Sequence, residues 1–154
     1  MEQLDGSYGT VLECLKSAGL TDKADRNRQA LIDALVGVLN GAREGLSSLY
    51  HPDIVFYEAD CLPYGGAHRG KEAVIAAVGQ LFEHFDRLET EVEEVLAAGE
   101  LTIIYLHVNF RVRKNGRSGR FPACELYRFQ DDKIIEWRVF YFDSNMVAEA
   151  LAAD

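Results

Sequence analysis

Two carboxylates that stand among apolar neighbours are the residues best suited to do chemistry. Glu58 shares a strand face with Ile54 and Phe56, and Glu125 shares one with Tyr127 and other apolar residues. Burial of a carboxylate in apolar surroundings raises its pKa unless a partner compensates. Glu58 is therefore a candidate general base, and Glu125 a candidate acid or hydrogen-bond donor to an oxyanion. A buried ion pair is the structural alternative for Glu125.

The segment from Leu101 to Val112 has two unlike faces. Its even positions are nearly all apolar, whereas its odd positions include Tyr105, His107 and Asn109. We expect the odd face to line a pocket, with His107 as an acid or base and Asn109 orienting substrate or water. The apolar even face would then be covered by a second subunit, giving a homodimer. A purely structural role is the alternative for His107.

Aromatic side chains supply the remaining candidates for ligand contact. Trp137 and Tyr141 alternate on one face near the end of the chain, where they suit the wall of an apolar pocket or an ordinary core. Asp60 lies two residues beyond Glu58 and either shares its role or is simply solvated. The expected substrate-binding residues are Phe56, Asp60, Tyr105, Asn109, Tyr127, Trp137 and Tyr141.

Helical and strand periodicities predict the elements that position these residues. Helices are predicted around residues 8–15, from a cap at Thr21 or Asp22 to about 40, over 42–50, from Gly70 to Phe85, and after a cap at Ser144. Strands are predicted at 54–58, 88–96, 101–112, 120–129 and 133–142, with turns at 98–99, 115–116 and 131–132.

The order of these elements predicts an α+β fold with helices gathered on one face of an antiparallel meander. Its 154 residues suit one domain at 26–154, preceded by an N-terminal helical extension at 1–25.

Composition limits the classes of partner. The formal net charge is −9, and the only dense basic run, at 111–120, surrounds a predicted turn, so nucleic acid is not an expected partner. The sequence shows neither a signal-like pattern nor a long apolar run, so we expect neither secretion nor a membrane span. Cys14, Cys61 and Cys124 lack disulfide or zinc spacing. We therefore expect a cytoplasmic protein without a metal site.

Three stretches together resemble the nuclear transport factor 2-like superfamily, which includes ketosteroid isomerases, limonene epoxide hydrolase and SnoaL-like polyketide cyclases. They are the Leu-Tyr-His-Pro-Asp run at 49–53, the His-Arg-Gly-Lys-Glu-Ala-Val run at 68–74, and the Trp-to-Asp run at 137–143. The likeness covers residues 27 to 151. It implies a cone-shaped curved sheet (a cystatin-like α+β roll) wrapped around helices, with a cavity inside and dimers packed through the outer sheet face.

The same resemblance places Glu58 at the base position and Glu125 at the oxyanion position of the ketosteroid isomerases. Ala34 stands where those isomerases carry a tyrosine, so steroid isomerisation is not expected. The water-activating residues of limonene epoxide hydrolase have no match either. SnoaL-like cyclases need an acid and a base in an apolar cavity, which Glu58, His107 and Glu125 can supply.

These observations predict an enzyme without a cofactor, of isomerase, cyclase or hydratase type, that transfers protons on a small apolar carbonyl or polycyclic compound. Glu58, Glu125 and His107 are the expected catalytic residues. The alternative is a non-catalytic member of the same fold, either a carrier of a small ligand or a protein-association domain.

Overall fold

The structure, a computed structural model, describes residues 22–39 and 44–153. The helix expected around residues 8–15 lies outside them. The elements in chain order are α2 (Asp22–Leu39), the 3₁₀ helix η1 (Gly45–Leu49), β1 (Tyr50–Glu58), β2 (Gly66–Arg69), α3 (Lys71–His84), β3 (Phe85–Ala98), β4 (Leu101–Val112), β5 (Ser118–Gln130), β6 (Lys133–Tyr141) and α4 (Ser144–Ala152).

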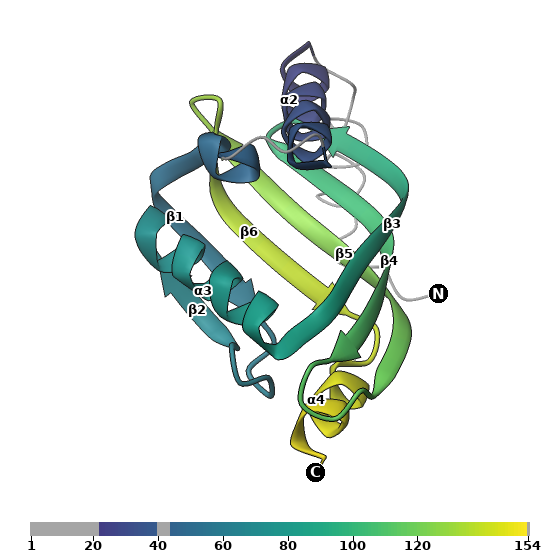
Figure 1. The fold of residues 1–154 in the computed structure, drawn as a ribbon. Coiled ribbons are helices and arrows are strands. Elements are labelled where there is room, and N and C mark those ends of the chain that lie inside the picture. The colour runs from purple at the N-terminus through teal and green to yellow at the C-terminus, as the bar shows by residue number, and fades with distance from the viewer. Residues whose placement is uncertain (1–21, 40–43, 154) are drawn as a thin grey trace, which may run out of the picture.

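Six strands form one sheet in the order β2-β1-β6-β5-β4-β3. The antiparallel meander predicted for the last four strands is confirmed, and β1 joins it by pairing parallel to β6. The sheet bends strongly, and α2 and α3 lie on its inner side (Figure 1). The α+β class predicted from the sequence is therefore confirmed.

The first half of the chain departs from the prediction in three ways. The short helix is a 3₁₀ turn that begins at Gly45, and β1 begins at Tyr50, ahead of the predicted start. Pro52 is tolerated in β1 because the pairing with β6 is irregular between Tyr50 and Val55, where its missing N–H is not needed. The four-residue strand β2 was not predicted at all, because a glycine-rich loop leads into it.

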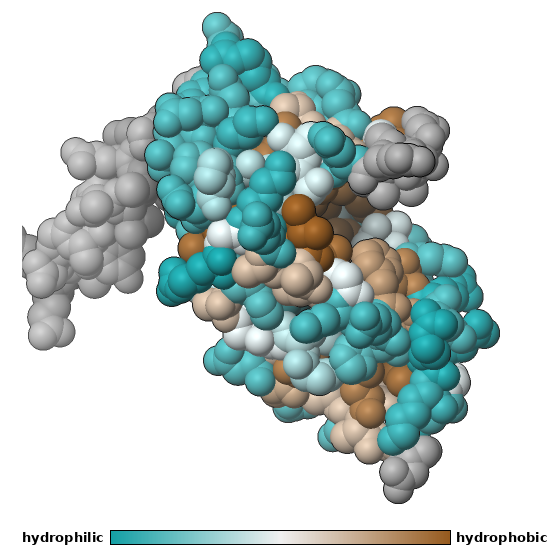
Figure 2. Space-filling model, turned by 60° about the vertical axis from the view of Figure 1, so that its left-hand side comes forward, coloured by the Kyte–Doolittle hydropathy of each residue, from teal (hydrophilic) through white to brown (hydrophobic). Residues whose placement is uncertain are grey.

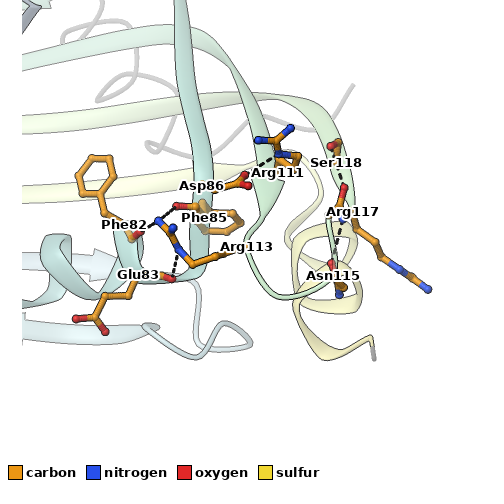
Figure 3. Close-up of polar contacts among 10 residues, drawn as sticks. Phe82, Glu83, Phe85, Asp86, Arg111, Arg113, Asn115, Arg117 and Ser118 are labelled. Atoms are coloured by element: carbon orange, nitrogen blue, oxygen red, sulfur yellow. Dashed lines mark hydrogen bonds and ion pairs between the residues drawn. The ribbon is translucent and has the colours of Figure 1, made fainter.

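Helix α3 ends one residue earlier than expected, and Arg113 explains how its end is held. The Arg113 guanidinium donates hydrogen bonds to the backbone carbonyls of Phe82, Glu83 and Phe85. Figure 3 shows this side chain reaching from the β4–β5 connection to the end of α3. The last carbonyls of a helix have no partner inside the helix, so a cation placed there satisfies them.

The tight turns of the meander lie where they were predicted. Gly99 and Gly116 adopt positive φ, as do Asp131 and Asp132, whose two successive positive values suit a two-residue hairpin turn. One helix cap differs: the Asp143 side chain, not Ser144, accepts the bond from Met146 N at the start of α4. The one-residue shift is physically minor, because aspartate and serine cap helices about equally well.

The core lies between the inner face of the sheet and the helices. Its fully buried large side chains include Leu31 from α2, Ile54 and Phe56 from β1, Ile104 from β4, Tyr127 and Phe129 from β5, and Val147 from α4. Among the residues that the structure describes, no helix is both long and apolar enough to cross a membrane.

Candidate functional site

A pocket of about 300 Å³ opens into the space between the curved sheet and the helices. Side chains from α2, η1, α3, α4 and the five long strands line it, and nearly all of them are aliphatic or aromatic. Phe82 and Val92 line it while remaining about half exposed, so they mark its mouth. The face drawn in Figure 2 shows hydrophobic side chains gathered around a hollow. Such a space suits a small, largely apolar ligand.

Two carboxyl groups interrupt this apolar lining, and they belong to Glu58 and Glu125, the two glutamates predicted from the sequence. Glu125 on β5 is directly opposite Val139 on β6. On the other side of β6, Tyr57 pairs with Arg138, so the next residue, Glu58, is level with Val139 as well. Neighbouring strands lie about 4.8 Å apart, so the backbones of the two glutamates are separated by roughly 10 Å. Only Val139 stands between them on the pocket face.

Glu58 is 7% exposed, and its Oε2 atom has no hydrogen-bond partner among the described residues. Burial raises the pKa of Glu58 to about 8, and the nearby charge of Glu125 adds to this shift. Hydrogen bonding from the Tyr141 side chain and from the backbone of Ala59 partly offsets it. Glu58 is therefore a carboxyl group that gains or loses its proton near neutral pH.

Glu125 accepts a hydrogen bond from the Tyr127 hydroxyl at Oε2. Burial raises the pKa of the Glu125 carboxyl, while the Tyr127 hydroxyl and the nearby Trp137 indole N–H act in the opposite direction. Burial is the largest cause, so the net shift of the Glu125 pKa is upward, toward the protonated form. A protonated carboxyl in an apolar pocket can donate a hydrogen bond to a ligand oxygen. Among the described residues, no arginine, lysine or histidine forms an ion pair with Glu125.

Three aromatic rings form a ladder across the three central strands of the site. Trp137 on β6 lies opposite Phe56 on β1 and opposite Tyr127 on β5. The Trp137 ring stacks on both neighbours, with ring centroids 4.1 Å from Phe56 and 5.5 Å from Tyr127. This ladder lies beside the row that holds the two glutamates.

Two pocket tyrosines were missed by the sequence analysis. Tyr64 follows Pro63 in a tight loop. The loop brings Gly65 close to the Ala59 carbonyl, and a Cβ at Gly65 would lie only 2.1 Å from that oxygen. The loop turns the Tyr64 side chain inward beside Glu58 and Tyr141, and Tyr50 borders the pocket near Glu125. A large ring flanked by proline and glycine was the one available signal for Tyr64.

The structure brings together six of the predicted residues and separates the rest. Phe56, Glu58, Glu125, Tyr127, Trp137 and Tyr141 all line the pocket. Asp60 does not: it is exposed and borders a separate hollow on the surface with Tyr57 and Arg138.

The prediction that Tyr105, His107 and Asn109 face the pocket is wrong. The even positions of β4 line the pocket, so the odd positions lie on the outer face of the sheet. His107 Nδ1 lies 2.6 Å from Glu93 Oε1, and Asn109 donates to Glu91. The polar residues face outward because the glutamates of β3 and the solvent lie on that side, whereas the apolar residues gain more from burial. His107 therefore cannot meet Glu58 and Glu125 in the pocket.

The outer face of the sheet has an apolar part and a charged part. Its exposed hydrophobic side chains include Leu96, Tyr105 and Phe140. Along β3 it carries the carboxylates Glu89, Glu91, Glu93 and Glu94. Within the described residues, no group of three or more His, Cys, Asp or Glu side chains is arranged to hold a metal ion.

Comparison with solved structures places this fold in the nuclear transport factor 2-like class. An NTF2-like protein from Burkholderia thailandensis superposes with a TM-score of 0.75 at 20% identity, over 82% of this chain and 98% of that one. A provisionally assigned SnoaL-like polyketide cyclase from Jannaschia gives 0.72 at 22%, over 88% and 99%. A protein of unknown function with a cystatin-like fold from Xanthomonas campestris gives 0.69 at 23%, over 81% and 96%.

The amino-acid sequence identifies the family of this chain. Residues 29–137 match the family model of the SnoaL-like domain, which is most of the chain. The chain therefore belongs to the SnoaL-like family, in agreement with the resemblance found in its sequence motifs. No curated protein matches the chain.

Proposed function

We propose that this protein is a cofactor-independent acid–base enzyme of isomerase, cyclase or hydratase type, acting on a small, largely apolar carbonyl or polycyclic compound. The observation that carries this proposal is the pair Glu58 and Glu125, which share one apolar pocket and flank Val139 from neighbouring strands. Titratable groups with raised pKa values in an apolar pocket are typical of acid–base sites.

The two carboxyls have different roles in the proposed reaction. The Glu58 carboxylate removes a proton from the carbon next to the substrate carbonyl, and the C–H electron pair becomes part of an enolate. The carbonyl oxygen takes up the resulting negative charge, and the protonated Glu125 stabilises it by donating a hydrogen bond. Glu58 then returns its proton to another carbon. Alternatively, the enolate attacks a second carbonyl to close a ring, and the proton held by Glu58 passes to the alkoxide that this attack forms.

The pKa of Glu58 gives this proposal a pH signature. With a pKa of about 8, Glu58 is mostly protonated at pH 7 and only the ionised minority can act as a base. We therefore expect kcat/KM to rise with pH until about 8 and then to level off.

The test is a proton-exchange assay with 2-tetralone, a flat apolar ketone with acidic protons beside its carbonyl. We expect the protein to accelerate exchange of those protons with D₂O, measured by NMR, and Glu58→Gln to abolish the acceleration. Glu91→Gln is the matched control, because it removes a carboxylate from the outer face. Unchanged exchange in Glu58→Gln contradicts the proposal. If the wild type binds 2-tetralone without accelerating exchange, the protein is a ligand carrier instead.

We also propose that two copies of this chain associate through the outer sheet face, in the cytoplasm. Phe140 is 50% exposed at the middle of that face, where it lies opposite Cys124, and Tyr105 follows on the next strand. Exposed rings gathered on one sheet face favour association. The free cysteines Cys61 and Cys124 suit a reducing compartment.

A further inference from the structure

Trp137 is the only tryptophan in the chain, and both faces of its indole are covered by protein. Phe56 stacks on one side from β1, and Tyr127 on the other from β5. A ring held in this way cannot serve as a flat wall for a ligand, which was its expected role. Only its edge is left for other contacts, and that edge includes the indole N–H.

The N–H edge of Trp137 has no other use in the structure. Its Nε1 atom is buried and forms no aligned hydrogen bond with the described residues. A buried N–H without a well-aligned partner is destabilising, so such groups are rare without a reason. Trp137 pairs with Tyr127, and Glu125 is two residues from Tyr127 on the same strand face, within diagonal reach of a large ring. The indole is also close enough to lower the pKa of Glu125.

We propose that Trp137 is a positioning residue for Glu125: its indole N–H and the Tyr127 hydroxyl together hold the Glu125 carboxyl in one orientation, which presents its proton to an acceptor oxygen of the ligand. The Tyr127 bond already occupies Oε2, so Oε1 is the oxygen that can carry the proton. The indole N–H, misaligned in the free protein, tightens onto the carboxyl when a ligand oxygen draws it into place, as hydrogen bonds in active sites commonly do. This inference rests on the role of Glu125 in the proposed function.

The single tryptophan allows a test that needs no ligand. In a ¹H–¹⁵N spectrum of the labelled full chain, one indole cross-peak reports Trp137 alone. We expect this peak to move in Glu125→Leu and less in Glu125→Gln, which keeps an acceptor oxygen, and to stay in place in Glu58→Gln. Tm measurements confirm that each variant is folded. If Glu125→Leu does not fold, Glu125→Gln alone provides the test. If the indole peak keeps its position in both Glu125 variants, the proposal is overturned.

A binding test separates positioning from packing. We compare the affinities of 2-tetralone and of tetralin, which has the same rings without the oxygen, by titration calorimetry. Trp137→Phe keeps a stacking ring but loses the N–H, so we expect the 2-tetralone affinity to fall about tenfold and that of tetralin to stay unchanged. Tyr127→Phe should act in the same way. Phe56→Leu is the packing control, and it should weaken both ligands equally.

The outcomes distinguish this inference from the proposed function. Equal losses for both ligands in Trp137→Phe, or a wild type that does not prefer 2-tetralone, overturn the positioning role. Neither result depends on turnover. Conversely, if Glu58→Gln exchanges protons as fast as the wild type while Trp137→Phe loses only the ketone, the acid–base function fails and the positioning of Glu125 stands.

Discussion

The two faces of this sheet carry the same residue types and give them opposite chemistry. On the pocket face, Glu58 and Glu125 stand among aromatic and aliphatic side chains, and burial raises the pKa of both. On the outer face, Glu91 accepts hydrogen bonds from Arg120 and Asn109, which lower its pKa. A carboxylate is therefore made reactive here by its surroundings, and the strand pleat alone decides which surroundings it meets.

This comparison also shows why a few polar groups on the pocket face can control the protonation of the two carboxyls. Each outer carboxylate is solvated and has polar neighbours, so losing one changes little. On the pocket face the tyrosines and the indole of Trp137 are the main neighbours that can hydrogen-bond to the two carboxyls. Because both carboxyls are buried in apolar surroundings, each such bond has more influence on the protonation state.

The largest expected effect is a pH dependence of stability caused by Glu58. Its pKa rises from 4.5 to about 8 on folding, so the folded state holds a proton that the unfolded state has released. The stabilisation is complete below pH 4.5 and is lost as the pH rises to 8, by roughly 3–5 kcal/mol. Urea unfolding of the wild type and of Glu58→Gln between pH 5 and 8.5 measures this.

In that experiment Glu58→Gln should remove most of the decline and should be the more stable protein at pH 8. Equal slopes of stability against pH in both proteins would show that Glu58 is not buried in the way described. The proton whose loss costs stability is also the one whose loss creates the proposed base. Activity and stability should therefore change in opposite directions across the same pH range.

The sequence predicted the pocket carboxyls correctly because their surroundings were local. Period-two alternation places Glu58 beside Phe56, and Glu125 beside Tyr127, whatever the rest of the fold does. The same pattern could not say which face of β4 points inward, because a polar face can line a pocket or meet water. His107 was misplaced for this reason, since its partner Glu93 comes from another strand with a local register shift.

Tertiary arrangement explains the other differences. Strand β2 has four residues and pairs only with β1, so its hydrophobic pattern is too short to be distinctive. The role of Trp137 depends on rings from two other strands that cover both of its faces. Strand β5 is joined to β6 by the predicted turn at 131–132, but β1 is far from β6 in the chain, and no local spacing reveals that these two strands pair.

The next largest effect concerns the proposed association through the outer face. We expect Phe140→Lys to weaken dimerisation roughly 30-fold, because it places a charge at the centre of an apolar interface. Sedimentation equilibrium measures the change. Phe82→Lys is the matched control, since Phe82 is similarly exposed but lies at the mouth of the pocket. A monomeric wild type, or equal weakening by both substitutions, contradicts association through this face.

The smallest expected effect belongs to Glu91 on the outer face, and its sign is opposite to that of Glu58. The pKa of Glu91 is lowered by Arg120 and Asn109, so the stability it contributes is present above pH 4.5 and is lost as the pH falls through its folded pKa. Glu91→Gln should therefore lower Tm at pH 7 by only about 1–2 °C. Added salt should shrink the difference, because exposed charges are screened. A salt-independent loss as large as the Glu58 effect would mean that the outer face is as dry as the pocket, and the contrast between the two faces would no longer hold.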